Sequence, residues 1–121
     1  MRKILVVDDN QFIQEVARSM LEPEGYEVNT FFNVDDAISA VDSNDYDLII
    51  TDIVMPEKTG IDFMEHLKKE NVGIPILAIT GGVENAIDDY VNFASLIADK
   101  AVAKPLVKDN LIEMIKELTE Q

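Results

Sequence analysis

The chain has 121 residues, 47% of them hydrophobic and none of them cysteine, which fits one compact domain over residues 1–121 and excludes disulfides and thiolate metal sites. Its 24 acidic and 10 basic residues give a net charge of −14 that would repel a phosphate backbone, so we do not expect this domain alone to bind nucleic acid. No segment approaches the roughly 20 apolar residues of a membrane span, and we expect a cytoplasmic protein without a membrane contact.

Five short apolar segments predict β-strands. They cover residues 3–7, 27–32, 47–51, 75–80 and 100–103. The first, third and fourth are almost continuous in Val, Ile and Leu, which is typical of parallel strands covered on both faces. The last segment is short and rich in alanine, and it is the weakest of the five predictions.

Helical patterns lie between these segments. Pro23 and Gly25 end the first helix, Asn33 is a suitable N-cap for a second over residues 34–42, and a third follows Gly60. A fourth pattern covers residues 86–94 and a last one residues 111–118. Strands that alternate with helices imply βαβ crossovers and a parallel sheet, so the sequence predicts one doubly wound, five-stranded α/β domain.

Acidic, basic or hydroxyl side chains stand at the ends of four of the five predicted strands, and only Asn33 follows the second. Asp8 and Asp9 come after the first strand, Asp52 after the third, Thr80 closes the fourth and Lys104 follows the fifth. Ligands of open parallel sheets bind at the carboxyl ends of the strands, so these side chains should converge at one edge. For Asp8 or Asp9 taken alone, a cap of the following helix is the favoured interpretation. All five residues together point to a functional site.

Clustered carboxylates have a defined chemistry. Two carboxylates about 4 Å apart repel by roughly 4 kcal/mol at an effective dielectric constant near 20, so the cluster would raise its own pKa values or recruit a cation. Oxygen ligands suit Mg²⁺, and a carboxylate can attack a phosphoryl group to form an aspartyl phosphate. A lysine and a hydroxyl at the same edge could stabilise the phosphoryl oxygens.

The segments VVDDN, DLIITDIVMPEKTG, PILAITGG and AVAKP resemble the signature blocks of the response-regulator receiver family, in the family's order and over the whole chain. The resemblance implies a flavodoxin-like (βα)5 fold with strand order 2-1-3-4-5. It implies that Asp52 is the phosphoacceptor and a direct Mg²⁺ ligand. Asp9 would be the second direct ligand, Asp8 would hold the metal through water, and the carbonyl of Val54 would be the backbone ligand.

The resemblance also assigns the remaining site residues and the partners. Thr80 would be the switch hydroxyl, Lys104 the ammonium that contacts the phosphoryl group, and Gly81 the small residue that gives the phosphoryl group access. The phosphodonor would be a sensor histidine kinase or a phosphotransfer protein. The output would pass to a downstream protein or a fused output domain, and the domain would catalyse only its own phosphorylation and dephosphorylation.

Two departures keep other hypotheses open. The family usually has an aromatic residue where this chain has Ala101, and the segment from Thr80 to Lys104 is slightly longer than is typical. A degenerate receiver that acts only through protein contacts is therefore one alternative. A phosphohydrolase with Asp52 as nucleophile is another, but hydrolases of the haloacid dehalogenase type carry an acid where this chain has Val54.

Other polar residues are assigned to the solvated surface. They are His66, the Asp88-Asp89 pair, Lys68 and Lys69.

Overall fold

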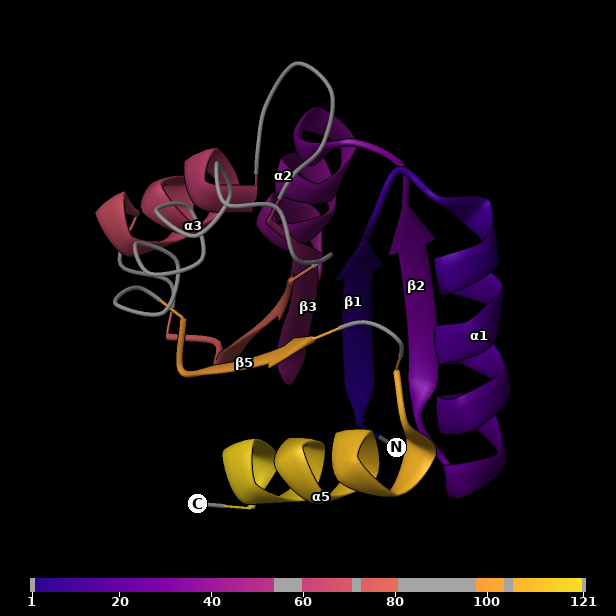
Figure 1. Cartoon of the computed structure of the whole chain (residues 1–121). Coiled ribbons are helices and arrows are strands. Elements are labelled where there is room, and N and C mark those ends of the chain that lie inside the picture. The colour runs from indigo at the N-terminus through magenta and orange to yellow at the C-terminus, as the bar shows by residue number, and fades with distance from the viewer. Residues whose placement is uncertain (1, 54–59, 71–72, 81–97, 104–105, 121) are drawn as a thin grey trace.

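The computed structural model describes residues 2–53, 60–70, 73–80, 98–103 and 106–120 (Figure 1). The strands are β1 (Lys3–Val7), β2 (Glu27–Phe31), β3 (Leu48–Asp52), β4 (Ile76–Thr80) and β5 (Lys100–Ala103). The helices are α1 (Gln11–Leu21), the 3-10 helix η1 (Glu22–Glu24), α2 (Val34–Ser43), α3 (Gly60–Lys69) and α5 (Lys108–Thr119). The predicted helix over residues 86–94 lies outside the described residues. None of the described helices combines the length and the apolarity needed to cross a membrane.

The five strands form one parallel sheet in the order β2-β1-β3-β4-β5. This confirms the expected flavodoxin-like strand order, with β2 and β5 at the edges. Strand β2 lies beside β1 on one edge, and the chain then crosses over so that β3 lies beside β1 on its other edge. The carboxyl ends of β1 and β3 are therefore neighbours at the switch point, where Val7 pairs with Thr51.

Alternate strand residues bury their side chains on opposite faces, and helices cover both faces. On one face, Leu5 and Val7 pack in a core cluster with α2 and α3. On the other face, Ile4 and Val6 pack in a second cluster with α1 and α5. Each face therefore has its own apolar core, which confirms the doubly wound architecture (Figure 1).

Short polar residues set the helix boundaries. The side chain of Asn10 accepts a hydrogen bond from the backbone N–H of Phe12, and that of Asn33 accepts one from Asp36. Both asparagines therefore act as N-caps, as predicted for Asn33. Gly25 follows η1 with a φ of 92°, a left-handed conformation that glycine adopts without strain. The predicted end of the first helix at Pro23 and Gly25 is confirmed, since α1 ends at Leu21 and η1 at Glu24.

Four predicted strand boundaries, in three strands, were off by one residue. β2 ends at Phe31, and the side chain of Phe32 is exposed. β4 begins at Ile76, after Pro75. β3 runs one residue later than expected, because Asp47 is held outside the strand by two hydrogen bonds to the backbone of Lys3. Asp52 is consequently the last residue of β3.

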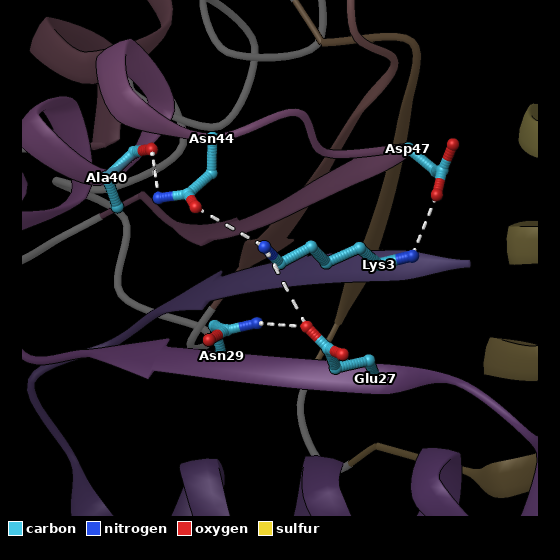
Figure 2. Close-up of polar contacts among 6 residues, drawn as sticks. All are labelled: Lys3, Glu27, Asn29, Ala40, Asn44 and Asp47. Atoms are coloured by element: carbon cyan, nitrogen blue, oxygen red, sulfur yellow. Dashed lines mark hydrogen bonds and ion pairs between the residues drawn. The ribbon is translucent and has the colours of Figure 1, made fainter. Parts of the chain in front are cut away.

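A polar network connects the amino-terminal ends of β1, β2 and β3, at the edge of the sheet opposite the acidic residues (Figure 2). The ammonium of Lys3 donates to Asn44 Oδ1 at 3.4 Å and pairs with Glu27 at 3.8 Å. Asn44 in turn donates to the carbonyl of Ala40 in the last turn of α2. The backbone N–H of Lys3 donates to Asp47 at 2.7 Å. The network joins β1, β2, α2 and the start of β3.

Candidate functional site

Three carboxylates from two neighbouring strands meet at the carboxyl edge of the sheet. Asp8 follows β1 and is fully buried, Asp52 ends β3 and is 4% exposed, and Asp9 is exposed. Each offers an oxygen atom, and these atoms lie within 4.8 Å of one another. Within the described residues this is the one group of acidic side chains placed closely enough to share a metal ion. The predicted convergence of these three residues is confirmed.

The helix-cap reading of the two aspartates is wrong. Asn10 caps α1, and its Oδ1 accepts from the N–H of Phe12 at 2.8 Å. The carboxylate of Asp8 instead accepts from the backbone N–H of Asn10 at 2.8 Å, which orients its side chain within the turn. Asp9 lies between these two residues and faces solvent. Neither acid is therefore needed to begin the helix.

The backbone of Asp52 is held closely. Its carbonyl accepts a hydrogen bond from the buried hydroxyl of Thr51 at 3.0 Å. The N–H of Gly60 donates to the carbonyl of Ile53 at 2.8 Å, which brings the start of α3 against the end of β3. A Cβ atom at Gly60 would overlap the carbonyl oxygen of Asp52 and would lie 2.9 Å from the Cα of Ile53. Gly60 is therefore required for close packing against Asp52.

The other predicted site residues are described only in part. Thr80 is the last residue of β4, beside β3, where its neighbour Ile79 pairs with Asp52. The backbone of Thr80 thus reaches the expected edge. Lys104, Val54 and Gly81 lie outside the described residues, as do Gly82, Asp88 and Asp89.

Ala101 lies in the predicted strand, whereas His66 is less exposed than the solvated position predicted for it. Ala101 lies in β5 and is exposed, so only a methyl group is present where the family usually has a ring. His66 is half-buried in the last turns of α3 and is not a member of the acidic cluster.

Sequence reasoning missed Gln14. Its side chain is 5% exposed, and its Nε2 donates to the carbonyls of Asp8 at 2.9 Å and Phe31 at 2.8 Å. The available signal was its position in α1, three and seven residues before the buried Ala17 and Leu21. A polar residue on an apolar helix face requires a buried hydrogen-bond partner.

The donor set fits a hard divalent cation. All three side chains offer oxygen, the ligand type that Mg²⁺ prefers. Asp8 and Asp52 are both buried, and two carboxylates 4.8 Å apart or closer repel by about 3.5 kcal/mol or more at an effective dielectric constant near 20. A bound cation would relieve this repulsion, and the exposed Asp9 gives it access from solvent. Asp8, Asp9 and Asp52 could therefore hold Mg²⁺.

Comparisons with known proteins agree with this geometry. A sequence model of the response regulator receiver domain matches residues 4–116. The response regulator SaeR of Staphylococcus aureus is 35% identical over 118 residues, which cover 98% of this chain and 50% of SaeR. The chain therefore spans about half the length of the curated relatives it matches.

Solved structures of similar proteins have the same fold. The response regulator TrrA of Thermotoga maritima, solved in complex with Mg²⁺ and BeF, is 34% identical, has a TM-score of 0.85, and is matched over 98% of this chain and 99% of TrrA. A CheY-like receiver domain of Methanospirillum hungatei is 28% identical, has a TM-score of 0.86, and is matched over 99% and 94% of the two chains. On the family match, the shared fold and the acidic cluster, this chain belongs to the response regulator receiver domain family of two-component systems.

Proposed function

We propose that Asp52 accepts a phosphoryl group in a Mg²⁺-dependent reaction and that this modification switches a protein-interaction surface. The observation that carries the proposal is the placement of Asp52, which ends β3, is 4% exposed and lies in one cluster with Asp8 and Asp9. Carboxylates are known nucleophiles in aspartyl-phosphate formation. The chemistry is limited to the domain's own phosphorylation and the slow loss of that group, so the domain is a signalling module and not a turnover enzyme.

The transfer is a displacement at phosphorus. A carboxylate oxygen of Asp52 attacks the phosphorus atom and forms an O–P bond. The bond from phosphorus to the donor's imidazole nitrogen or acyl oxygen breaks, and its electron pair leaves with the donor. Because the Asp52 carbonyl is held by Thr51 and packed against Gly60, the nucleophile starts from a fixed backbone, which favours an in-line approach.

Asp9 and Asp52 would be direct Mg²⁺ ligands, with Asp8 bound through water and the Val54 carbonyl as a backbone ligand. When bound, Mg²⁺ supplies positive charge that offsets the charge on the phosphoryl oxygens. Thr80 and Lys104 would contact those oxygens. The Mg²⁺–BeF complex of the similar TrrA supports this assignment.

The partners follow from the family. We propose that a sensor histidine kinase or a phosphotransfer protein donates the phosphoryl group, and that a downstream protein or a fused output domain receives the signal. The curated relative SaeR is about twice the length of this chain, which supports a fused output domain as one arrangement. Ala101 exposes only a methyl group, so the output does not depend on the movement of a ring at that position.

Intact-mass spectrometry tests the proposal. Incubation with Mg²⁺ and acetyl phosphate should add one phosphoryl group to the wild type and none to Asp52→Asn. Asp45→Asn is the matched control, because Asp45 is exposed just before the opposite end of β3, and it should label like the wild type. Equal labelling of Asp52→Asn would refute the assignment. Rapid release of inorganic phosphate over many turnovers, in place of a slow loss of the label, would favour a phosphohydrolase.

A further inference from the structure

We infer that Gln14 is a positioning residue for the acidic site, because its side-chain amide fixes the peptide that joins Asp8 to Asp9. The inference rests on the proposed function and extends it to a residue that touches neither the metal nor the phosphoryl group. Gln14 should affect the affinity for Mg²⁺ and leave the role of Asp52 as nucleophile unchanged.

The side-chain amide of Gln14 donates two hydrogen bonds at the carboxyl edge of the sheet. Nε2 donates to the carbonyl of Asp8, after β1, at 2.9 Å and to the carbonyl of Phe31, at the end of β2, at 2.8 Å. The side chain is 5% exposed, so water does not replace these bonds easily. Helix α1 thereby holds the ends of two strands through one side chain.

The hydrogen bond from Gln14 affects the position of Asp9. The carbonyl of Asp8 and the N–H of Asp9 belong to one planar peptide, so the bond from Gln14 sets the direction in which Asp9 leaves β1. On its other side, the N–H of Asn10 donates to Asp8 Oδ1 at 2.8 Å, and Asn10 caps α1. Asp9 is exposed, yet its backbone is held at both ends. A ligand ordered before the metal arrives loses less entropy on binding.

The alternative is that Gln14 only ties β1 to β2. That connection does not depend on it, since five residue pairs join the two strands and the N–H of Asp8 also donates to the carbonyl of Phe31 at 3.1 Å. A residue that only stabilised the fold would change the melting temperature and leave the affinity of the folded protein for Mg²⁺ unchanged. The two roles therefore differ in a measurable quantity.

Gln14→Met keeps the length of the side chain and removes its donors. Gln11→Met is the matched control, since Gln11 is exposed on the same helix and among the described residues its amide bonds only to Glu15, at 3.2 Å. Backbone amide chemical shifts, followed during a Mg²⁺ titration of the whole chain, report the affinity. Loss of a residue that orients a metal ligand typically weakens binding about 10- to 100-fold. We expect a loss of about tenfold in Gln14→Met and none in Gln11→Met.

Labelling by acetyl phosphate provides a second readout. The Mg²⁺ concentration for half-maximal rate should rise by the same factor in Gln14→Met, whereas the rate at saturating Mg²⁺ should match the wild type. Unchanged affinity in Gln14→Met would overturn the inference even if its melting temperature falls. If that variant does not fold in buffer, both proteins are titrated in trimethylamine N-oxide, which favours the folded state without replacing the lost donors. A wild type that binds no Mg²⁺ would overturn the proposed function as well.

Discussion

Replacement of Gly60 by alanine tests how closely α3 must approach the phosphoacceptor. The added Cβ would overlap the carbonyl oxygen of Asp52, 2.8 Å from its carbonyl carbon and 2.9 Å from the Cα of Ile53. Real Cβ atoms essentially never lie within 3.0 Å of such neighbours. All three neighbouring atoms belong to the backbone, so no flexible side chain can yield. Either the end of β3 or the start of α3 has to move.

The magnitude follows from this geometry. An extra methyl group in a well-packed region costs typically about 1–3 kcal/mol. We expect the upper end, because every residue of β3 is buried and the strand has neighbours on both sides. Alanine is the better helix former by about 1 kcal/mol, and this offsets part of the cost at the first residue of α3. A net loss of about 2 kcal/mol corresponds to a melting temperature roughly 10 °C lower.

Thermal unfolding of three glycine variants separates the causes. Gly73→Ala introduces a Cβ with no atom of a described residue within 4 Å, so it should leave stability unchanged or raise it by about 0.5 kcal/mol. The Cβ of Gly25→Ala likewise has no described neighbour within 4 Å, but its φ of 92° should cost about 1 kcal/mol. Gly60→Ala should be the least stable of the three and should also label more slowly with acetyl phosphate. If Gly60→Ala has the same melting temperature as Gly73→Ala, Gly60 does not pack closely against Asp52.

Three further outcomes are expected. Mg²⁺ at 100 times its dissociation constant should stabilise the wild type by about 2.7 kcal/mol. Asp9→Asn should be up to about 1 kcal/mol more stable than the wild type without Mg²⁺ and should lose most of the stabilisation by Mg²⁺. A wild-type melting temperature that does not change with Mg²⁺ would contradict this. Burial, with a smaller effect from Glu27, raises the pKa of Tyr46 above its usual 10.0, so stability that depends on the neutral phenol is complete below pH 10.0 and declines as pH rises through the folded-state pKa. Tyr46→Phe should weaken that alkaline decline in thermal melts, and an identical decline would exclude Tyr46 as its source. Gly82 cannot orient an attacking water, so the aspartyl phosphate should decay slowly and Gly82→Glu should change the decay rate measured by intact mass; an unchanged rate would contradict the prediction.

The sequence predicted the fold well because its signals are local. Near-continuous apolar strands, Asn33 as a cap and the turn at Gly25 each depend on a few neighbouring residues. The weakest segment, residues 100–103, is a strand because β4 pairs with it and not because of its own composition. An edge strand needs burial on fewer sides, so its sequence pattern is weaker.

The acidic cluster was predictable for a different reason. Parallel strands place their carboxyl ends at one edge, so the positions after β1 and β3 meet whatever the residues are. The roles of Gln14 and Gly60 depend on contacts that this rule does not contain. Gln14 donates to a carbonyl 17 residues away, and Gly60 packs against the backbone of Asp52. Residue type and spacing do not specify such contacts, because they depend on the final positions of the helices.

The three aspartates of the site differ in their exposure to solvent, and this difference has a chemical consequence. Asp8 and Asp52 are buried on fixed backbone, so their relative position is set before any ligand arrives. Asp9 is the exposed member, and it is held mainly through the peptide that Gln14 fixes. We therefore expect changes near Asp9 to act mainly on Mg²⁺ affinity. Changes at Asp52, the proposed nucleophile and a proposed Mg²⁺ ligand, should affect both Mg²⁺ affinity and phosphoryl transfer. Substitutions near Asp9 would then alter Mg²⁺ affinity without altering the nucleophile.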